Sequence, residues 1–420
     1  MSSRLYLYTP NEPGPRKYKK LRRFRSSNRK SPSRRNQNKV QSQVIQNCNC
    51  KFPPIRQPNN QMSTMVTRNV MTVAPEPIFY NQPNLSNSST NQNKIIGGNQ
   101  EYSQVNIIGK GAFGVVYSAI MANGKQVAIK KVSQNPKYKN HEHEILKMIN
   151  NKYCVKMINS FKSSDENYDD CNNIIKRNYL NIVMNYMPHN LHDYIQCHKV
   201  QNYYPPIIMA KLFAYQIFLG LSYLHSPRIN ITHRDLKPRN VLVDPDTGEL
   251  KICDFGSAKI LSPKEPNASY IASRYYRAPE LIMKCTNYTN KIDIWAAGCI
   301  FAEILTGGVP LFQSNTSRGQ LGEIFKIIGH PTTSDLESFQ HEISDEELIE
   351  IKKNARKTIK LDSVMPPHVP PDVIELLNDI FQYNPQKRPS ANQCLYHRCF
   401  GELFRKGTTL PNGMPIPPIE

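Results

Sequence analysis

The feature that most constrains this chain is the polar run His233-Arg234-Asp235-Leu236-Lys237-Pro238-Arg239-Asn240, followed fourteen residues later by Asp254-Phe255-Gly256. A carboxylate such as Asp235 can accept a hydroxyl proton, and carboxylate and amide oxygens are ligands that Mg²⁺ prefers. Taken singly, Asp235 could equally be a capping carboxylate and Lys237 a surface cation. Combined with Asn240 and Asp254 at this spacing, they predict one catalytic site. The fold must therefore bring the two segments together.

A second motif is the glycine turn formed by Gly109, Gly111 and Gly114, which is followed by Val116. The spacing Gly-x-Gly-x-x-Gly is weak evidence alone, because dinucleotide-binding folds place it between a strand and a helix. Here strand-like segments flank it on both sides, at 102–108 and 115–121. We therefore favour a flexible hairpin that closes over phosphates, and we expect ATP as the nucleotide.

Lys130 ends the run Val127-Ala128-Ile129-Lys130 on a strand predicted at 125–132. Taken alone, a solvated edge-strand lysine is the better interpretation. A lysine that binds phosphates needs a carboxylate to hold it, and Glu142, twelve residues later, could supply one.

Glu144 is the rival partner of that lysine, on a helix predicted at 139–149. Residues two apart point to different faces of a helix. We take Ile145 and Met148 to mark the inward stripe of this helix, and that side favours Glu142.

The order of predicted elements indicates an α+β protein with two lobes. Two more short strands are predicted at 172–187, and long helices at 207–224 and 292–305. We expect a disordered basic tail rich in Asn, Ser and Pro at 1–100 and a C-terminal tail at 406–420. Between them we expect a small lobe, made of a sheet and one main helix, at 101–187, and a larger, mostly helical lobe at 188–405.

The charge of the chain is concentrated at its N-terminus. The whole chain carries 54 basic and 33 acidic residues, a net charge of +21, while residues 1–95 alone carry 17 basic and 2 acidic, or +15. Residues 16–39 hold twelve of these basic residues and no acidic one. Such a segment cannot bury enough apolar surface to fold. A solvated tail, a patch for nuclear import or for nucleic acid and other polyanions, and a pseudosubstrate arm all remain open.

The ten cysteines show no spacing of a disulfide framework, which favours a reducing intracellular compartment. Cys394, His397 and Cys399 fall in a helix-like stretch and are expected in the core, not around zinc. The most apolar stretch, 292–309, contains Asp293 and Glu303 and therefore predicts a buried helix and no membrane span.

The segments 244–259, DPDTGELKICDFGSAK, and 265–277, EPNASYIASRYYR, resemble the glycogen synthase kinase 3 family of the CMGC group of eukaryotic serine/threonine protein kinases. The resemblance covers about residues 102–405. It implies the bilobal kinase fold, MgATP as cosubstrate, and Ser/Thr residues of proteins as substrates. It also implies that Tyr270 is phosphorylated, and it places Arg388 as a buried partner of Glu280.

The resemblance assigns a role to each part of the site. Asp235 accepts the hydroxyl proton, Lys237 neutralises the transferring phosphoryl group, and Asn240 and Asp254 hold Mg²⁺. The adenine binds the backbone at 185–187, with Met184 at the back of the pocket. The expected ATP-binding residues are Ile108, Gly109, Gly111, Gly114, Val116, Ala128, Lys130, Glu142, Met184, Asn185, Tyr186 and Met187.

The family prefers substrates already phosphorylated four residues C-terminal to the acceptor, and it holds that priming phosphate with three basic residues. Arg234 and Lys259 match two of them, but the third, an arginine in the family, is His141 here. Histidine near neutral pH is mostly uncharged and lacks the bidentate fork of arginine. We therefore expect a weaker preference for primed substrates.

Several expectations concern partners and location. The resemblance suggests scaffold proteins as partners near 344–360, although the sequence follows the family only loosely there. Ser26 and Ser27 in the basic tail match an inhibitory phosphorylation site poorly. We expect a cytoplasmic protein, with nuclear import permitted by the tail. Rival interpretations are an inactive pseudokinase, which should lack one essential residue, a nucleic-acid-binding protein, and a cyclin-dependent kinase relative.

Overall fold

The structure is a computed structural model that describes residues 94–111, 114–134, 141–168, 174–262, 265–339 and 358–419. Most of the basic N-terminal tail, with Ser26 and Ser27, lies outside these residues, as does most of the expected scaffold region at 344–360. Those expectations stay predictions.

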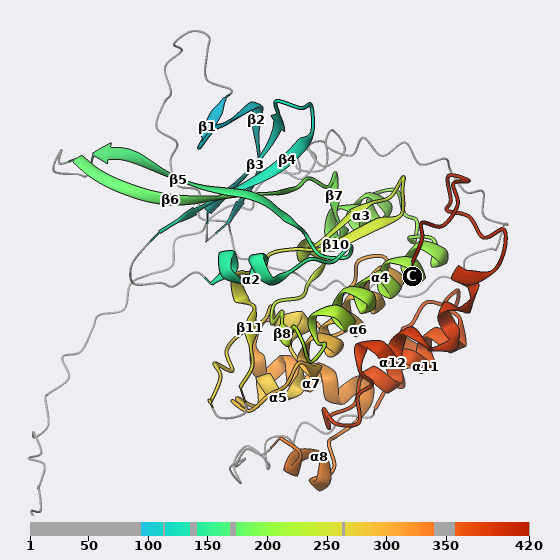
Figure 1. Cartoon of the computed structure of the whole chain (residues 1–420). Helices are drawn as coiled ribbons and strands as arrows, with labels where there is room; N and C mark the ends of the chain where they lie inside the picture. The colour runs from blue at the N-terminus through green and yellow to red at the C-terminus, as the bar shows by residue number, and fades with distance from the viewer. Residues whose placement is uncertain are drawn as a thin grey trace, which may run out of the picture. The chain divides into compact units, whose positions relative to one another are not determined.

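A six-stranded antiparallel sheet forms the first lobe, which we call the sheet lobe (Figure 1). Its strand order is β1-β2-β3-β4-β6-β5. The strands are β1 (Ile95–Gly97), β2 (Gln100–Gly111), β3 (Gly114–Met121), β4 (Gln126–Ser133), β5 (Met157–Tyr168) and β6 (Ile174–Asn185). The strands predicted at 102–108, 115–121 and 125–132 are present as β2, β3 and β4. The prediction of two short strands at 172–187 is wrong, because the single strand β6 spans most of that stretch and pairs with β5, which was not predicted.

The sheet lobe has a small apolar core of its own, built around Tyr102, Val127, Ile129 and Val183, which are fully buried. The ring of Tyr102 stacks on that of Phe161 with 5.7 Å between centroids. Alternating apolar residues place these side chains on one face of the sheet. This core fixes β4, the strand that carries Lys130.

The single described helix of the sheet lobe, α2 (Glu142–Met148), begins after His141, whose side chain makes no cap hydrogen bond. Our assignment of Met148 to the inward stripe is wrong, because Met148 is 42 % exposed. The buried stripe is Glu142, Ile145, Leu146 and Ile149. These positions are spaced i, i+3, i+4 and i+7 and so share one helical face, whereas Met148 lies about 100° from its centre.

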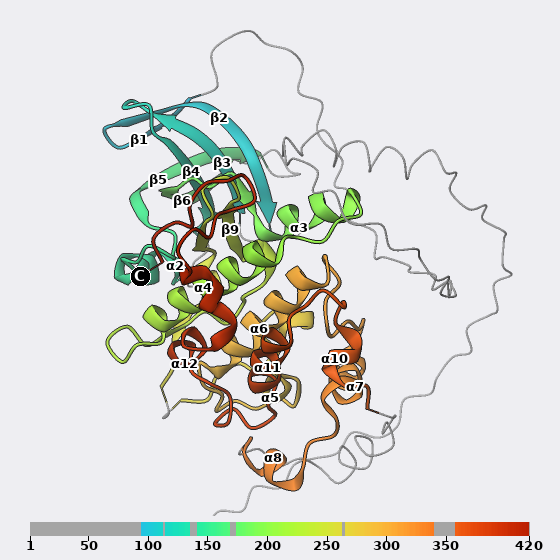
Figure 2. The ribbon, with the colours of Figure 1, turned by 90° about the vertical axis from the view of Figure 1, so that its right-hand side faces the viewer.

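Buried apolar helices form the core of the second, helical lobe. α4 (Ile207–Leu224) packs against α6 (Lys291–Leu305), in which every residue after Lys291 is buried. Both helices were predicted. α11 packs against α6, and α12 against α4 (Figure 2). The other helices are α3 (Leu191–Val200), α5 (Pro279–Ile282), α7 (Ser317–Ile328), α8 (Thr333–Glu337), α10 (Leu361–Val364), α11 (Pro371–Ile380) and α12 (Ala391–Leu395).

Within the described residues, α4 is long and apolar enough to cross a membrane, but 72 % of it is buried in the protein. The core of the helical lobe accounts for its apolar composition. Cys394 and Cys399 are also buried in that core, as expected. In the described part of the chain no group of three or more His, Cys, Asp and Glu side chains is placed to bind a metal ion.

Two small sheets position the catalytic loops. β7 (His189–Asn190), β9 (Val241–Asp244) and β10 (Glu249–Ile252) form one, and β8 (Ile231–Thr232) pairs with β11 (Lys259–Ile260) in the other. β8 immediately precedes the loop 233–240 and β9 immediately follows it, while β10 leads into Asp254. The pairing of β9 with β10 therefore brings the two polar segments together.

Residues 406–419, expected as a tail, contact the folded helical lobe. Leu410 and Ile419 are buried, and the Lys152 ammonium donates a hydrogen bond to the Pro418 carbonyl. The Asn412 amide donates to the Asp246 carbonyl at 2.8 Å. Apolar residues on either side of the prolines, together with polar groups of the segment, provide these contacts.

Arg388 and Glu280 form the expected buried ion pair. Two parallel hydrogen bonds of 2.7 Å join the guanidinium to the carboxylate, and both residues are about 1 % exposed. Three backbone carbonyls, those of Gln382, Lys291 and Tyr383, accept further bonds from Arg388.

We predict that Arg388→Met destabilises the protein by about 3–5 kcal/mol, because it leaves the Glu280 charge buried without a partner. Urea unfolding followed by circular dichroism measures this. Arg398→Met is the matched control, since the Arg398–Glu375 pair is 72 % and 48 % exposed and should contribute less than about 1 kcal/mol. Equal losses in the two variants would contradict the prediction.

Candidate active site

The loop 233–240 is held by a buried carboxylate at the start of α6. The Asp293 side chain accepts hydrogen bonds from the backbone N–H of His233 at 2.7 Å and of Arg234 at 2.9 Å. It also contacts Nε2 of His225 at 2.9 Å. Burial alone would raise the pKa of Asp293, but its hydrogen bond to His225 and the nearby histidines lower it below the ordinary value. Asp293 was expected only as part of a buried helix.

The catalytic loop is joined to the segment around Asp254 at two points. The Cys253 N–H donates to the Asn240 carbonyl at 2.9 Å, and Nε2 of His233 lies 3.0 Å from the Cys253 carbonyl. The His233 ring also packs edge-on against Phe255, which is fully buried. Asn240 and Asp254, fourteen residues apart in sequence, are therefore held close together.

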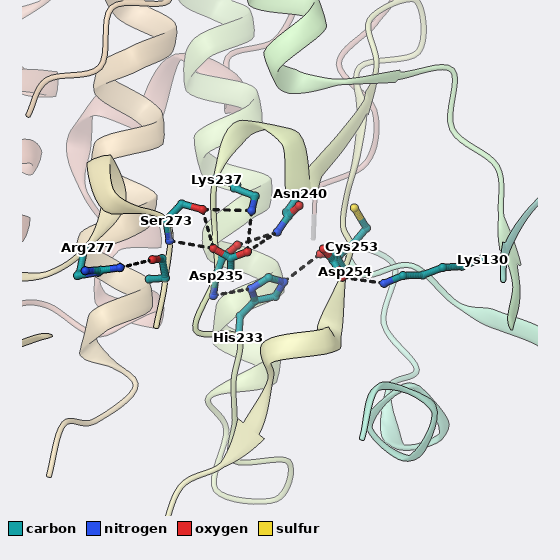
Figure 3. A network of polar contacts seen from close by, with 10 residues as sticks. Lys130, His233, Asp235, Lys237, Asn240, Cys253, Asp254, Ser273 and Arg277 are labelled. Carbon is teal, nitrogen blue, oxygen red and sulfur yellow. Dashed lines mark hydrogen bonds and ion pairs between the residues drawn. The ribbon is translucent and has the colours of Figure 1, made fainter. Parts of the chain in front are cut away.

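Asp235 lies in a dense set of hydrogen bonds (Figure 3). Its Oδ2 accepts from the Lys237 ammonium at 2.7 Å. Its Oδ1 accepts from the N–H and the hydroxyl of Ser273, both at 2.9 Å. The Asn240 amide donates to the Asp235 carbonyl at 2.8 Å. The predicted residues Asp235, Lys237 and Asn240 are thus brought together.

Ser273 is a site residue that the sequence analysis missed. It is 38 residues from Asp235, yet its hydroxyl bonds to Asp235 and accepts from Lys237 at 3.1 Å. Nothing in the local sequence distinguishes this serine from its neighbours in the stretch before Arg277. Only the path of the chain back across the catalytic loop shows its position.

Lys130 links the two lobes. Its ammonium lies 2.7 Å from each Glu142 carboxylate oxygen and 2.8 Å from Oδ1 of Asp254. Glu142 is buried, whereas Glu144 is exposed and pairs with Lys147. Lys130 therefore contacts Glu142, as predicted, and not Glu144.

The charges of this cluster stabilise one another. Burial lowers the pKa of Lys130, but Glu142 and Asp254 together raise it above the ordinary value. Burial raises the pKa of Asp254, while Lys130 lowers it, and the net pKa is below the ordinary value. Lys130 is therefore positive and Asp254 negative at neutral pH.

The predicted nucleotide residues lie along neighbouring strands of the sheet lobe. In the strand register Val116 pairs with Lys130, and Ala128 pairs with Met184. Because side chains alternate along a strand, these four share one face of the sheet. Asn185, Tyr186 and Met187 follow directly, half-exposed, at the end of β6. They lie where a purine could be bound by backbone groups.

The glycine turn joins β2 to β3, with Gly111 opposite Gly114. At Gly114, φ is +150°, and an added Cβ would lie 2.0 Å from the Lys131 carbonyl oxygen. No side chain fits there. Ile108 and Gly109 precede the turn on β2, where Ile108 is 51 % exposed. At Gly111, by contrast, an added Cβ would meet no atom within 4 Å.

Asn240 and Asp254 suit Mg²⁺ by the chemistry of their donors. The Asn240 amide nitrogen binds Asp235, which leaves the amide oxygen as a ligand. Asp254 uses Oδ1 for Lys130 and is 35 % exposed, so the carboxylate keeps an accessible side. Two protein oxygens, completed by phosphates and water, are typical of Mg²⁺ sites.

Two of the three expected phosphate-binding residues, Arg234 and Lys259, lie at the pairing of β8 with β11, in which Lys259 is opposite Thr232, two residues before Arg234. Arg234 donates to the Ser257 carbonyl at 2.6 Å and to the Tyr288 hydroxyl at 3.1 Å. Lys259 donates to Asn267 at 2.8 Å. His141 lies apart from both in sequence, exposed at the start of α2.

Tyr270, the expected phosphorylation site, is 78 % exposed. The Arg277 guanidinium lies 4.6 Å from its ring centroid and donates to the carbonyls of Ile271 and Ala272 at 2.9 and 2.8 Å. Ala272 adopts a φ of +63°, which costs energy in a residue other than glycine. Arg277 stabilises that conformation.

The family model for the protein kinase domain matches residues 102–400, which is most of the chain. The match spans the glycine turn, the Lys130 cluster and the Asp235 loop described above. A phosphotransferase that uses ATP and acts on proteins accounts for all three parts. The chain belongs to the protein kinase domain family.

Proposed function

We propose that this protein kinase is a serine/threonine kinase that transfers the γ-phosphoryl group of MgATP to hydroxyls of protein substrates. The observation that carries the proposal is the position of Asp235. Its carboxylate is held by Lys237 and Ser273 next to Asn240, and it is partly accessible at 18 %. A carboxylate so placed can accept the proton of an incoming hydroxyl.

The remaining groups position the nucleotide and offset its charge. Lys130, fixed by Glu142, binds phosphate oxygens, and Lys237 neutralises charge on the phosphoryl group in transfer. Asn240 and Asp254 hold Mg²⁺, which supplies positive charge to the phosphates when bound. An inactive pseudokinase is disfavoured, because Lys130, Glu142, Asp235, Asn240 and Asp254 are all present.

The finer assignment to a family like glycogen synthase kinase 3 rests on the sequence at 244–259 and 265–277. Arg234 donates to the Ser257 carbonyl, two residues before Lys259, and Lys259 lies opposite Thr232 in the pairing of β8 with β11; this arrangement supports a site for a priming phosphate. With His141 in place of an arginine, that site has two permanent cations. We propose that primed substrates are preferred only weakly, and that Tyr270 is a phosphorylation site.

We predict that Asp235→Asn lowers kcat on a serine peptide by roughly 10²–10⁴-fold, because the variant lacks the proton acceptor. Radioactive ATP and peptides that differ only in a Ser, Thr or Tyr acceptor measure this. The wild type should label Ser and Thr. A variant that retains full kcat, or a wild type that labels only Tyr, would contradict the assignment.

We predict that Glu142→Gln lowers kcat/KM by roughly ten- to hundredfold, as expected for the loss of a hydrogen bond between charged groups. Glu144→Gln is the matched control on the same helix, and it should leave kcat/KM unchanged because Glu144 is exposed. Steady-state assays at varied ATP concentration measure both. If the two variants behave alike, the Lys130–Glu142 contact does not serve catalysis.

We predict that His141→Arg raises the ratio of kcat/KM on primed over unprimed peptides by roughly ten- to hundredfold, since it adds a charge-assisted hydrogen bond to phosphate. The two peptides should differ only in a phosphoserine four residues C-terminal to the acceptor. An unchanged ratio, with an unchanged melting temperature, would show that His141 does not face the priming phosphate.

A further inference from the structure

A cavity of about 460 Å³ lies in the helical lobe. It is formed by the start of α6, the second half of α11, the turn that follows α11, and α12 (labelled in Figure 1). None of the residues that line it belongs to the catalytic loop, the nucleotide residues or the expected priming-phosphate residues. Its volume falls in the range of small-molecule sites. The cavity is therefore large enough for a ligand of its own.

Lys291, the first residue of α6, lines this cavity as a half-buried cation. Its ammonium donates a hydrogen bond to the Arg388 carbonyl at 2.5 Å. Burial lowers the pKa of Lys291, and among the described residues no carboxylate is close enough to raise it; the other groups that act on it are the Cys394 thiol and Arg388. An ammonium group has three N–H donors, so two remain for a ligand.

Lys387 brings a second positive charge to the cavity. Its ammonium is 59 % exposed and forms only a long ion pair, 4.0 Å from Asp335. The Asp335 carboxylate is already engaged, because it caps α8 by accepting from the N–H and the hydroxyl of Thr332 at 2.9 and 2.8 Å. Within the part of the chain that the structure describes, neither Lys291 nor Lys387 thus has a close carboxylate.

The other charged groups of the cavity do not neutralise these two ammonium groups. The Arg388 guanidinium is held by Glu280 in the buried ion pair described above. Asp379 is exposed near the end of α11 and is not among the groups that shift the pKa of Lys291. With Arg388 balanced by Glu280, two ammonium groups stand against one carboxylate. The lining of the cavity is therefore net positive.

Uncharged donors complete the polar lining. The side-chain Oε1 of Gln393 accepts from the Ser390 N–H at 2.7 Å, which leaves the amide nitrogen of Gln393 as a donor. Nδ1 of His397 accepts from the Cys399 N–H at 3.3 Å, so Nε2 carries the proton of the neutral ring. A phosphate group has three strong acceptor oxygens and a charge of about −1.5 to −2 at neutral pH. It matches this set of donors better than a carboxylate does.

We propose that this cavity binds a small phosphate ester, with Lys291 and Lys387 at the phosphate. Asp379 and two glutamines of the lining, Gln382 and Gln386, suit hydroxyl groups in the rest of the molecule, because carboxylate and amide groups form hydrogen bonds with hydroxyls. The ligand class is therefore a phosphorylated sugar or polyol. The cavity shares no residue with the active site, so the proposal is independent of the proposed function.

Binding at this cavity should stabilise the folded chain. Lys291 and Arg388 exchange hydrogen bonds, because the Lys291 carbonyl also accepts from the Arg388 guanidinium at 3.3 Å. A phosphate at Lys291 supplies the negative charge that this cation lacks, next to the buried Arg388–Glu280 pair. A ligand that binds only the folded state raises the melting temperature.

The test is isothermal titration calorimetry on the full chain, with Mg²⁺ and a non-hydrolysable ATP analogue present to occupy the active site. The titrants are ribose 5-phosphate, ribose, inorganic phosphate and a phosphoserine peptide. Lys291→Met and Lys387→Met are the cavity variants. Arg398→Met is the matched control, since Arg398 does not line the cavity and pairs with the exposed Glu375. Lys259→Met controls for the expected priming-phosphate residues.

We expect ribose 5-phosphate to bind, inorganic phosphate to bind more weakly and ribose not to bind. Lys291→Met should weaken the binding of ribose 5-phosphate by roughly ten- to hundredfold, as for the loss of a hydrogen bond between charged groups. Lys387→Met should weaken it by roughly two- to fivefold, as for an exposed ion pair. Arg398→Met and Lys259→Met should keep the wild-type affinity. The ligand should raise the melting temperature of the wild type and not that of Lys291→Met.

Absence of saturable heat with ribose 5-phosphate in the wild type would overturn the inference. So would an unchanged affinity in Lys387→Met, which tests the cavity even where Lys291→Met fails to fold. An equal loss in Lys259→Met would instead place the phosphate at the priming residues. Tighter binding of the phosphoserine peptide than of ribose 5-phosphate, with the same dependence on Lys291, would contradict the assignment to a small molecule.

Discussion

The contact on which the rest of the site depends is the one between Lys130, Glu142 and Asp254. It joins a strand and a helix of the sheet lobe to the loop before Phe255 in the helical lobe, through N···O distances of 2.7–2.8 Å. One ammonium offsets two carboxylates in a largely buried place, where an unpaired charge would be costly. Because each partner comes from a different element, the contact forms only when both lobes adopt this arrangement.

Much of the site could be predicted from sequence because its chemistry needs particular residues at fixed spacings. One short stretch of sequence contains Asp235, Asn240 and Asp254. The hairpin of β9 and β10 brings Asp254 back to the loop that carries Asp235 and Asn240. Most of the strands and the two longest described helices follow from apolar periodicity. Glu142 does contact Lys130 as predicted, although one of the two residues used to mark the inward face, Met148, is in fact exposed.

The parts that could not be predicted depend on contacts between distant segments. Ser273 reaches Asp235 only because residues 265–277 fold back over the catalytic loop, and a serine has no local signature for that. From the sequence, Asp293 was only a charged residue in an apolar helix. In the structure its carboxylate accepts hydrogen bonds from the backbone N–H groups of His233 and Arg234 and so fixes the loop. Residues 406–419 contain four prolines but bury Leu410 and Ile419, because few apolar side chains suffice to hold a chain on a preformed surface.

The cations of the catalytic loop differ in how far neighbouring groups hold them. Within the described loop 233–240, Arg234 and Lys237 are engaged by neighbours, whereas Arg239 is exposed and unpaired. The most direct test of the central claim is a single-turnover measurement with purified protein, radioactive ATP and excess Mg²⁺. We expect label on a serine hydroxyl of a protein substrate, and none when the metal is chelated. Tight ATP binding without label on any hydroxyl would contradict it.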